Sequence, residues 1–218
     1  MSAGDPPRDP AGTALAAADA TLAAAGATLA AEAARFASFG WMRGTSGNLS
    51  LVLSRQPPRL AVTASGVDKG SLAAADVVLV DFDGRAVAGH GPWLRPSAEA
   101  AMHGRIARVA GAGTVVHVHT VAAVVAGRRW PGGIELADLE MLKGIGVAGA
   151  GERVTLPVIA NSQDMAELGD RFEAARQPRV PAVVVADHGL YAWGADPLRA
   201  RHHTEIVQWL LEVTVALG

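Results

Sequence analysis

The segment Thr114-Val115-Val116-His117-Val118-His119-Thr120 has the β-branched residues and alternating character of a strand. Residues i and i+2 of a strand point to the same face, so His117 and His119 are expected to lie side by side. Two neighbouring imidazoles can hold one metal ion, although His-x-His alone is a weak signal. The same pattern also fits two hydrogen-bonded histidines on a half-buried strand. The segment predicts a strand and leaves metal binding as one of two interpretations.

A third histidine, His188, follows the apolar residues 183–186 and precedes Gly189. The end of a strand is where a side chain can leave the core, and a glycine there lets the backbone turn or a ligand approach closely. The alternative is an ordinary polar residue between a strand and a loop. Three neutral imidazoles with an open position suit a catalytic zinc site. Nitrogen ligands also suit manganese, iron, cobalt or nickel.

The composition limits the classes of protein that fit. The chain has 218 residues, of which 50% are hydrophobic, and this length suits one domain. Its formal net charge of −2 offers no basic excess for nucleic acid, so no nucleic-acid partner is expected. The chain has no cysteine, which excludes disulfides and thiolate metal sites. Any metal must therefore be held by histidines and carboxylates.

Neither a signal peptide nor a membrane-spanning segment is expected. Residues 1–12 are rich in proline, aspartate and glycine, which predicts a disordered tail. The alanine-rich residues 14–34 include Asp19 and Glu32, so they lack the unbroken apolar span of a transmembrane helix. The expected location is the cytoplasm, with no membrane partner.

Residues 13–218 are expected to form a single α/β domain, a layered sandwich of sheet and helices. Helices are predicted over residues 13–39, 71–75, 97–111, 121–126, 138–144 and 163–175, and from Pro197 onward. Strands are predicted over residues 49–53, 60–63, 77–82, 114–119, 154–159 and 183–186, the last continuing through 191–193.

Two loops and one glutamate are further candidates for function. The loops are Gly44-Thr45-Ser46-Gly47-Asn48 and Thr63-Ala64-Ser65-Gly66, whose backbone N–H groups and hydroxyls suit a phosphate, although either loop alone fits an ordinary turn. Glu140 is flanked by apolar residues, so it fits a pocket in which its pKa is raised for acid/base work. A solvated glutamate in the first turn of a helix fits the spacing as well.

Five segments, taken in order, resemble the class II aldolase and adducin head family. They are residues 44–50, 63–66, 96–99 with His103, 117–120 and 188–190. The resemblance extends from the first helix to the last. It implies a central, mainly antiparallel β-sheet flanked by helices. It also implies one zinc ion per subunit, with other divalent ions as alternatives, and a symmetric homotetramer with sites near the subunit interfaces.

Residues 139–144, 157–164 and 188–194 resemble one branch of this family, the methylthioribulose-1-phosphate dehydratases. That resemblance implies dehydration of a phosphorylated ketose, 5-methylthioribulose 1-phosphate, to 2,3-diketo-5-methylthiopentyl 1-phosphate in methionine salvage. The metal ligands then fall on His117, His119 and His188, and the catalytic acid/base on Glu140. The phosphate-binding positions are Ser46, Gly47, Ser65 and Gly66, with Ser97 as a further candidate. Trp93, Met102, Leu190 and Trp193 are candidates for lining the methylthio pocket.

Two rival functions stay open at this point. In class II aldolases and epimerases, a glutamate in a Pro-Ser-Ser-Glu motif serves as the base, and Glu99 matches it. The second serine of that motif is Ala98 here, which departs from the aldolase pattern and removes a phosphate hydroxyl. The other rival is an adducin-like module without enzymatic activity. The three histidines argue against it, because a scaffold does not need convergent metal ligands.

Overall fold

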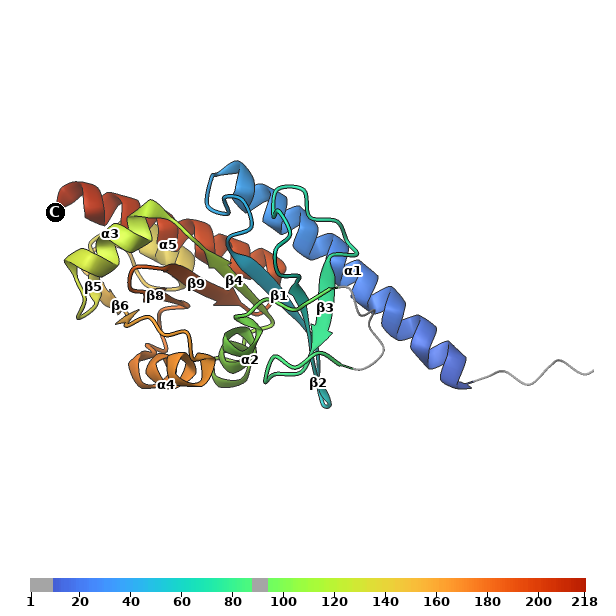
Figure 1. Cartoon of the computed structure of the whole chain (residues 1–218). Helices are drawn as coiled ribbons and strands as arrows, with labels where there is room; N and C mark the ends of the chain where they lie inside the picture. The colour runs from blue at the N-terminus through green and yellow to red at the C-terminus, as the bar shows by residue number, and fades with distance from the viewer. Residues whose placement is uncertain (1–9, 88–93) are drawn as a thin grey trace, which may run out of the picture.

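A seven-stranded sheet forms the middle layer of the computed structural model, which describes residues 10–87 and 94–218 (Figure 1). Its strands run in the order β3-β2-β1-β4-β9-β8-β7. Neighbouring strands are antiparallel, except for the parallel pair β7–β8. The sheet is therefore mixed and mostly antiparallel. The strands are β1 (Asn48–Arg55), β2 (Pro58–Thr63), β3 (Val77–Val80), β4 (Thr114–Val118), β7 (Val158–Ile159), β8 (Ala182–Val185) and β9 (Gly189–Gly194).

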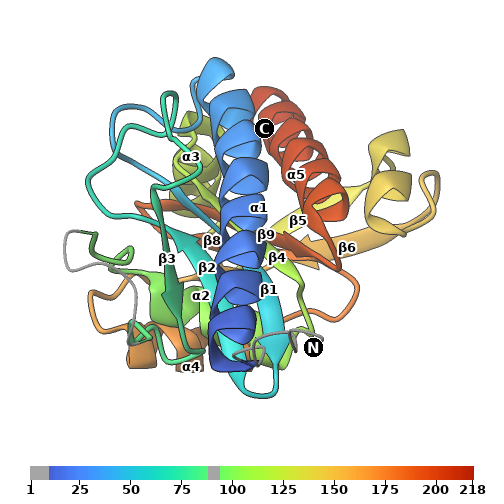
Figure 2. The same cartoon turned by 90° about the vertical axis from the view of Figure 1, so that its right-hand side faces the viewer.

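Helices cover both faces of this sheet, as expected for a layered α/β domain. The helices α1 (Pro10–Ser38), α3 (Val121–Arg129) and α5 (Pro197–Leu217) lie on one face, and α2 (Ala100–Val109) and α4 (Met165–Ala175) lie on the other (Figure 1). Helices α1 and α5 run side by side (Figure 2), where Arg35 Nε contacts Glu205 Oε1 at 2.6 Å. The strands β5 (Ile134–Ala137) and β6 (Arg153–Leu156) form a separate antiparallel pair, joined through the 3₁₀ helix η1 (Glu140–Ile145).

The alternation of side chains along β4 positions the histidines. Val116 and Val118 point into the core beneath α1, α3 and α5. Val115 points to the other face and packs in the cluster that α2 and α4 cover. His117 shares the face of Val115, because residues two apart in a strand point the same way. Its register partner on β9 is Tyr191, whose ring stacks on the imidazole with the centroids 4.0 Å apart.

Phe172 of α4 is central to the core on the histidine side of the sheet. Its side chain is 0% exposed, and its ring meets Trp193 edge-on at 5.5 Å. Replacing Phe172 with alanine is expected to lower the free energy of unfolding by about 3–5 kcal/mol, as measured by urea denaturation. Leu217→Ala, at a position that is 80% exposed, is the control and should change it by less than about 0.5 kcal/mol. A loss below about 1 kcal/mol for Phe172→Ala would contradict this packing.

Two strand predictions fail where the backbone changes direction. Residues 154–159 do not form one strand, because Pro157 lacks an N–H group and divides them into β6 and β7, which belong to different sheets. Residues 191–193 do not continue the strand of residues 183–186. The chain reverses at Asp187, which has φ 58°, so β8 and β9 pair as antiparallel neighbours.

Three further differences concern short or terminal elements. Residues 71–75 form turns where a helix was predicted, because so short a segment does not repay the cost of helix nucleation, and Asp76 Oδ2 accepts the N–H of Ala73 instead. Strand β5 was not predicted. The first helix begins at Pro10, three residues before the predicted start at Thr13. The tail prediction otherwise falls on residues 1–9, which lie outside the described part of the chain.

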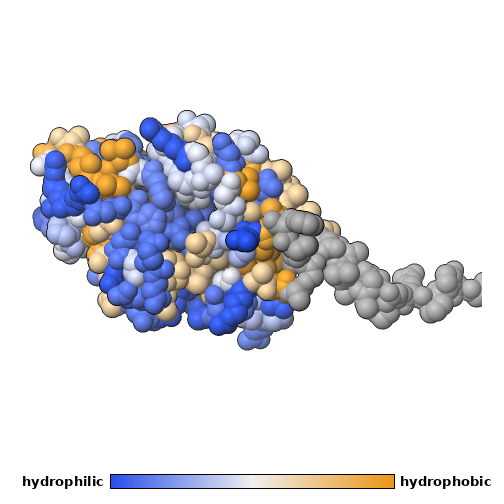
Figure 3. All heavy atoms as spheres, in the orientation of Figure 1, coloured by the Kyte–Doolittle hydropathy of each residue, from blue (hydrophilic) through white to orange (hydrophobic). Residues whose placement is uncertain are grey.

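Large apolar side chains are exposed at the end of the molecule where α3 and the C-terminus of α5 lie (Figure 3). Val121 and Leu217 are 75% and 80% exposed there. Within the described residues, no helix combines the length and the apolar character that crossing a bilayer requires.

Candidate active site

The three predicted metal ligands converge in the structure. His117 Nε2 lies 2.9 Å from His119 Nε2 and 3.3 Å from His188 Nε2. One ring nitrogen from each residue can be chosen so that all three lie within 4.8 Å of one another. Strand β4 supplies His117 and, one residue beyond its end, His119, and the turn between β8 and β9 supplies His188. The side-by-side placement of His117 and His119 agrees with the strand period.

The backbone at this point leaves no room for side chains at two glycines. A Cβ on Gly189 would lie 2.4 Å from the carbonyl oxygen of Val118, so only glycine lets β9 run this close to β4 beside His188. A Cβ on Gly47 would lie 2.8 Å from the carbonyl oxygen of His117, and Gly47 has φ 76°. Glycine at these two positions therefore lets the loop before β1 and the start of β9 pack directly against the backbone of β4, beside the histidines.

The hydrogen bond of His117 determines which of its nitrogens is free. Burial lowers the pKa of His117 to about 3, so its ring is neutral at neutral pH. Its Nδ1–H donates to the carbonyl oxygen of Leu190 at 3.1 Å, which leaves Nε2 without a proton. The lone pair of Nε2 then faces the nitrogens of His119 and His188. Lone pairs gathered at this spacing fit a divalent cation among them.

Glu99 is the carboxylate of this cluster. Its Oε2 lies 3.4 Å from His117 Nε2, and its Oε1 lies 3.4 Å from His188 Nε2. Burial acts to raise the pKa of Glu99, but the hydrogen bond from Asn48 favours the ionised carboxylate, and the pKa is lowered to about 2. Among the described residues, the buried atom His188 Nδ1 has no hydrogen-bond partner. An ionised carboxylate beside the neutral imidazole of His117 is the protonation state that cation binding needs.

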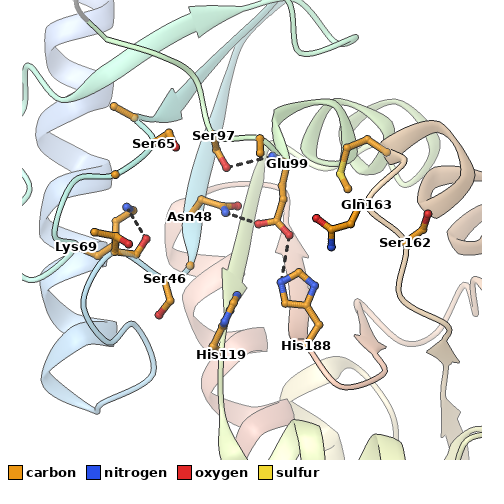
Figure 4. A pocket seen from close by; sticks show the side chains of 16 residues that line it. Ser46, Asn48, Ser65, Lys69, Ser97, Glu99, His119, Ser162, Gln163 and His188 are labelled. Carbon is orange, nitrogen blue, oxygen red and sulfur yellow. Dashed lines mark hydrogen bonds and ion pairs between the residues drawn. The ribbon is translucent and has the colours of Figure 1, made fainter.

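A cavity of about 390 Å³ opens above this cluster, a volume that suits a small molecule (Figure 4). His119, His188 and Glu99 line it, and His117 lies buried beneath. Every predicted phosphate-binding residue also lines it: Ser46, Gly47, Ser65, Gly66 and Ser97. Ser97 Oγ accepts the backbone N–H of Glu99 at 3.2 Å and so helps to fix that residue. The structure thus brings both small-residue loops to the histidines.

Lys69 lines the same cavity and was missed in the sequence. Its side chain is buried, and Nζ donates to the carbonyl oxygens of Val67 at 2.6 Å and Thr45 at 3.3 Å. Burial lowers the pKa of Lys69. Lys69 follows the Ser65-Gly66 loop by three residues, and this proximity to a candidate phosphate loop was the only indication in the sequence that it could have a role. Its burial depends on contacts that form only in the fold. Two more lining residues, Ser162 and Gln163, lie in the segment that resembles the dehydratases, where no role was predicted for them.

Glu140 does not lie at this cavity within its own subunit. It begins η1, its side chain is 73% exposed, and it pairs with Lys143 Nζ at 2.5 Å. Its apolar neighbours Leu142 and Ile145 turn into the core, while the carboxylate faces outward. The role predicted for Glu140 therefore stays a prediction, and it requires a second copy of the chain or a movement of η1.

The candidates for the methylthio pocket lie elsewhere. Met102, Leu190 and Trp193 pack in the hydrophobic core, and Trp93 falls outside the described residues. A second cavity of about 460 Å³ adjoins the first, because His119 lines both. Its apolar lining includes Phe39, Trp41 and Val125.

Residues 27–215 match the class II aldolase and adducin N-terminal domain. The chain belongs to this family. Among curated relatives, methylthioribulose-1-phosphate dehydratase of Sulfurihydrogenibium sp. (strain YO3AOP1) is 36% identical over 176 residues, which cover 80% of this chain and 81% of the relative. The enzyme of the same name from Sorangium cellulosum (strain So ce56) is 38% identical over 185 residues, covering 82% and 85%.

Solved structures of the class II aldolase family share the fold. An L-fuculose 1-phosphate aldolase superposes with a TM-score of 0.70 at 22% identity, covering 87% of this chain and 84% of the aldolase. YgbL from Escherichia coli, a putative aldolase/epimerase/decarboxylase, gives a TM-score of 0.73 at 20% identity, with 90% and 91% covered. These likenesses confirm the expected sheet flanked by helices.

Proposed function

We propose that this chain dehydrates 5-methylthioribulose 1-phosphate to 2,3-diketo-5-methylthiopentyl 1-phosphate. The observation that carries the proposal is one cavity that is lined by two small-residue loops and by two of the three convergent histidines, with the third buried beneath them. The family membership and the names of the relatives support this substrate. The proposed assembly is a homotetramer with one zinc ion per subunit, in the cytoplasm and in the methionine salvage pathway.

His117, His119 and His188 would hold the ion. It would act there as a Lewis acid on the substrate carbonyl, which makes the neighbouring C3–H bond more acidic. Neutral imidazoles suit zinc and also other divalent ions. Glu99, ionised and close to two of the ligands, adds negative charge that favours a cation at this position.

The phosphate would lie between the two loops at the other side of the cavity. The hydroxyls of Ser65 and Ser97 and the backbone N–H groups of Gly47 and Gly66 would supply donors, and Ser46 would join them by turning its hydroxyl away from the carbonyl oxygen of Arg43. Lys69 is the one lysine or arginine among the described residues that line this cavity, and it supplies positive charge to the same end. Binding at the phosphate holds the reacting carbons in position.

Proton transfer is assigned to Glu140 of a neighbouring copy. It would take the proton from C3 and return it to the C4 hydroxyl, which leaves as water, and the enol that remains becomes the diketone. One carboxylate can serve both steps when the two groups lie on the same side of the substrate. The exposure of Glu140 leaves it available for a site in another subunit. The apolar cavity beside His119 suits the methylthio group.

Aldol cleavage is the second candidate, and one observation favours it. Glu99, which matches the base of the aldolases, lies in the cavity, whereas Glu140 of the same subunit does not. A class II aldolase or epimerase acting on another ketose phosphate would use the same histidines.

A substrate panel separates these two functions. The purified protein, with its metal content measured, is given methylthioribulose 1-phosphate, fuculose 1-phosphate and rhamnulose 1-phosphate in turn. We expect an ultraviolet-absorbing diketone from the first sugar and no dihydroxyacetone phosphate from the other two. A chelator-treated sample is the control and should lose the activity. Dihydroxyacetone phosphate as the main product would instead establish aldol cleavage.

A further inference from the structure

A buried network of hydrogen-bonded polar side chains lies directly beneath Glu99. Asn48 and Ser50 point to the same face of β1, and His103 follows Glu99 by one turn of α2. His103 Nδ1 lies 2.8 Å from Ser50 Oγ, and its Nε2 lies 2.5 Å from Asn48 Oδ1. Asn48 Nδ2 lies 2.6 Å from Glu99 Oε2. His103 is 0% exposed, so this end of the hydrogen-bond network is not in contact with solvent.

In this network, the donor and acceptor of each hydrogen bond determine the donor and acceptor of the next one. The ionised carboxylate of Glu99 can only accept, so Asn48 must present its NH₂ group there. Asn48 Oδ1 then faces His103 and can only accept, so Nε2–H of His103 donates. Burial lowers the pKa of His103 to about 4, and a neutral ring carries one proton. Its Nδ1 is therefore an acceptor, and the Ser50 hydroxyl donates to it.

We propose that His103 is a positioning residue that acts through Asn48 to hold the carboxylate of Glu99 against the metal-binding histidines. The backbone of Asn48 also lies opposite His117 in the register of β1 and β4, which fixes the position of this residue beside a metal-binding histidine. Glu99 reaches His117 and His188 at 3.4 Å each, and a rotation of its side chain would break both contacts. The inference rests on the proposed metal site.

Zinc affinity tests this proposal without relying on turnover. His103→Phe keeps an aromatic ring of similar size and removes both hydrogen bonds, whereas His103→Gln keeps a donor and an acceptor. Zinc is added to the metal-depleted full-length protein in competition with a chromophoric chelator. We expect zinc to bind about 10- to 100-fold more weakly to His103→Phe than to the wild type. His103→Gln should recover part of that loss.

A double-mutant cycle separates positioning from general destabilisation. If His103 acts through Glu99, His103→Phe should weaken zinc binding in the wild type and have almost no further effect in Glu99→Gln. Thermal unfolding of each variant checks that the folded state is retained. His202→Phe, an exposed histidine on α5, is the matched control and should bind zinc as the wild type does.

Three outcomes are distinguishable. Zinc binding by His103→Phe within about twofold of the wild type overturns the proposal. A loss of equal size in the wild-type and Glu99→Gln backgrounds also overturns it, because the effect then does not pass through Glu99. If the wild type itself binds no zinc, the proposed metal site fails before His103 is tested.

Discussion

Replacing Glu140 with glutamine should lower kcat by about two to four orders of magnitude, the usual contribution of a general acid/base. The substitution keeps the size and polarity of a side chain that faces solvent, so the fold should be retained. The metal should stay, because Glu140 does not line the cavity that holds the histidines. Steady-state kinetics with methylthioribulose 1-phosphate and elemental analysis of the same sample measure both effects.

Hybrid oligomers test whether Glu140 acts across a subunit boundary. Glu140→Gln subunits keep the histidines, and His117→Ala subunits keep the glutamate. If each site takes Glu140 from one neighbour, an equal random mixture should recover about a quarter of the wild-type activity. A mixture as inactive as its two components would show that Glu140 acts within its own subunit or not at all. Near-normal turnover by Glu140→Gln alone would remove it from the mechanism.

Lys143→Gln is a matched control for Glu140. It removes the ion-pair partner of Glu140 from the same exposed turn without removing the carboxylate. Exposed pairs of this kind contribute about 0–1 kcal/mol, so stability should change little. Turnover close to that of the wild type would show that the loss in Glu140→Gln comes from the carboxylate itself.

The parts of the site that the sequence predicted are those that local geometry determines. A strand period of two is enough to place His117 beside His119, and the apolar run before His188 marks the end of β8. The loops at Ser46 and Ser65 were recognised by composition, although the shared cavity appeared only in the fold. The layered α/β architecture followed from the same periodicities and from the resemblance.

The parts that were missed depend on contacts between distant segments. No catalytic or binding role was predicted for His103, and only the fold shows that it is buried against β1, with its ring nitrogens next to Ser50 and Asn48. Nothing within residues 65–70 indicates that Lys69 is buried. Of the apolar residues that follow Glu140, Leu142 and Ile145 pack in the core of their own subunit while Met141 is exposed, and this sequence pattern is the same whether the carboxylate faces a pocket or solvent.

Removing the imidazole of His117 should have the other large effect, because this residue lies at the centre of the cluster. His117→Ala should reduce the bound metal from one ion per subunit to almost none, as measured by elemental analysis after dialysis. Lewis-acid assistance is worth several kcal/mol of barrier, so kcat/KM should fall by about a thousandfold or more. Excess zinc in the assay should not restore it, since two imidazoles remain where the site needs three.

A loss of folding would imitate this result, because His117 is buried and bonded to Leu190. His119→Ala answers that objection, since His119 is half-buried and its removal disturbs less of the core. Both variants should lose the metal, and His202→Ala should keep it. If His117→Ala and His119→Ala both fold and retain a stoichiometric ion after dialysis, the ion is not held by these histidines. Their convergence would then be a hydrogen-bonded cluster, the other interpretation that the alternating strand allowed.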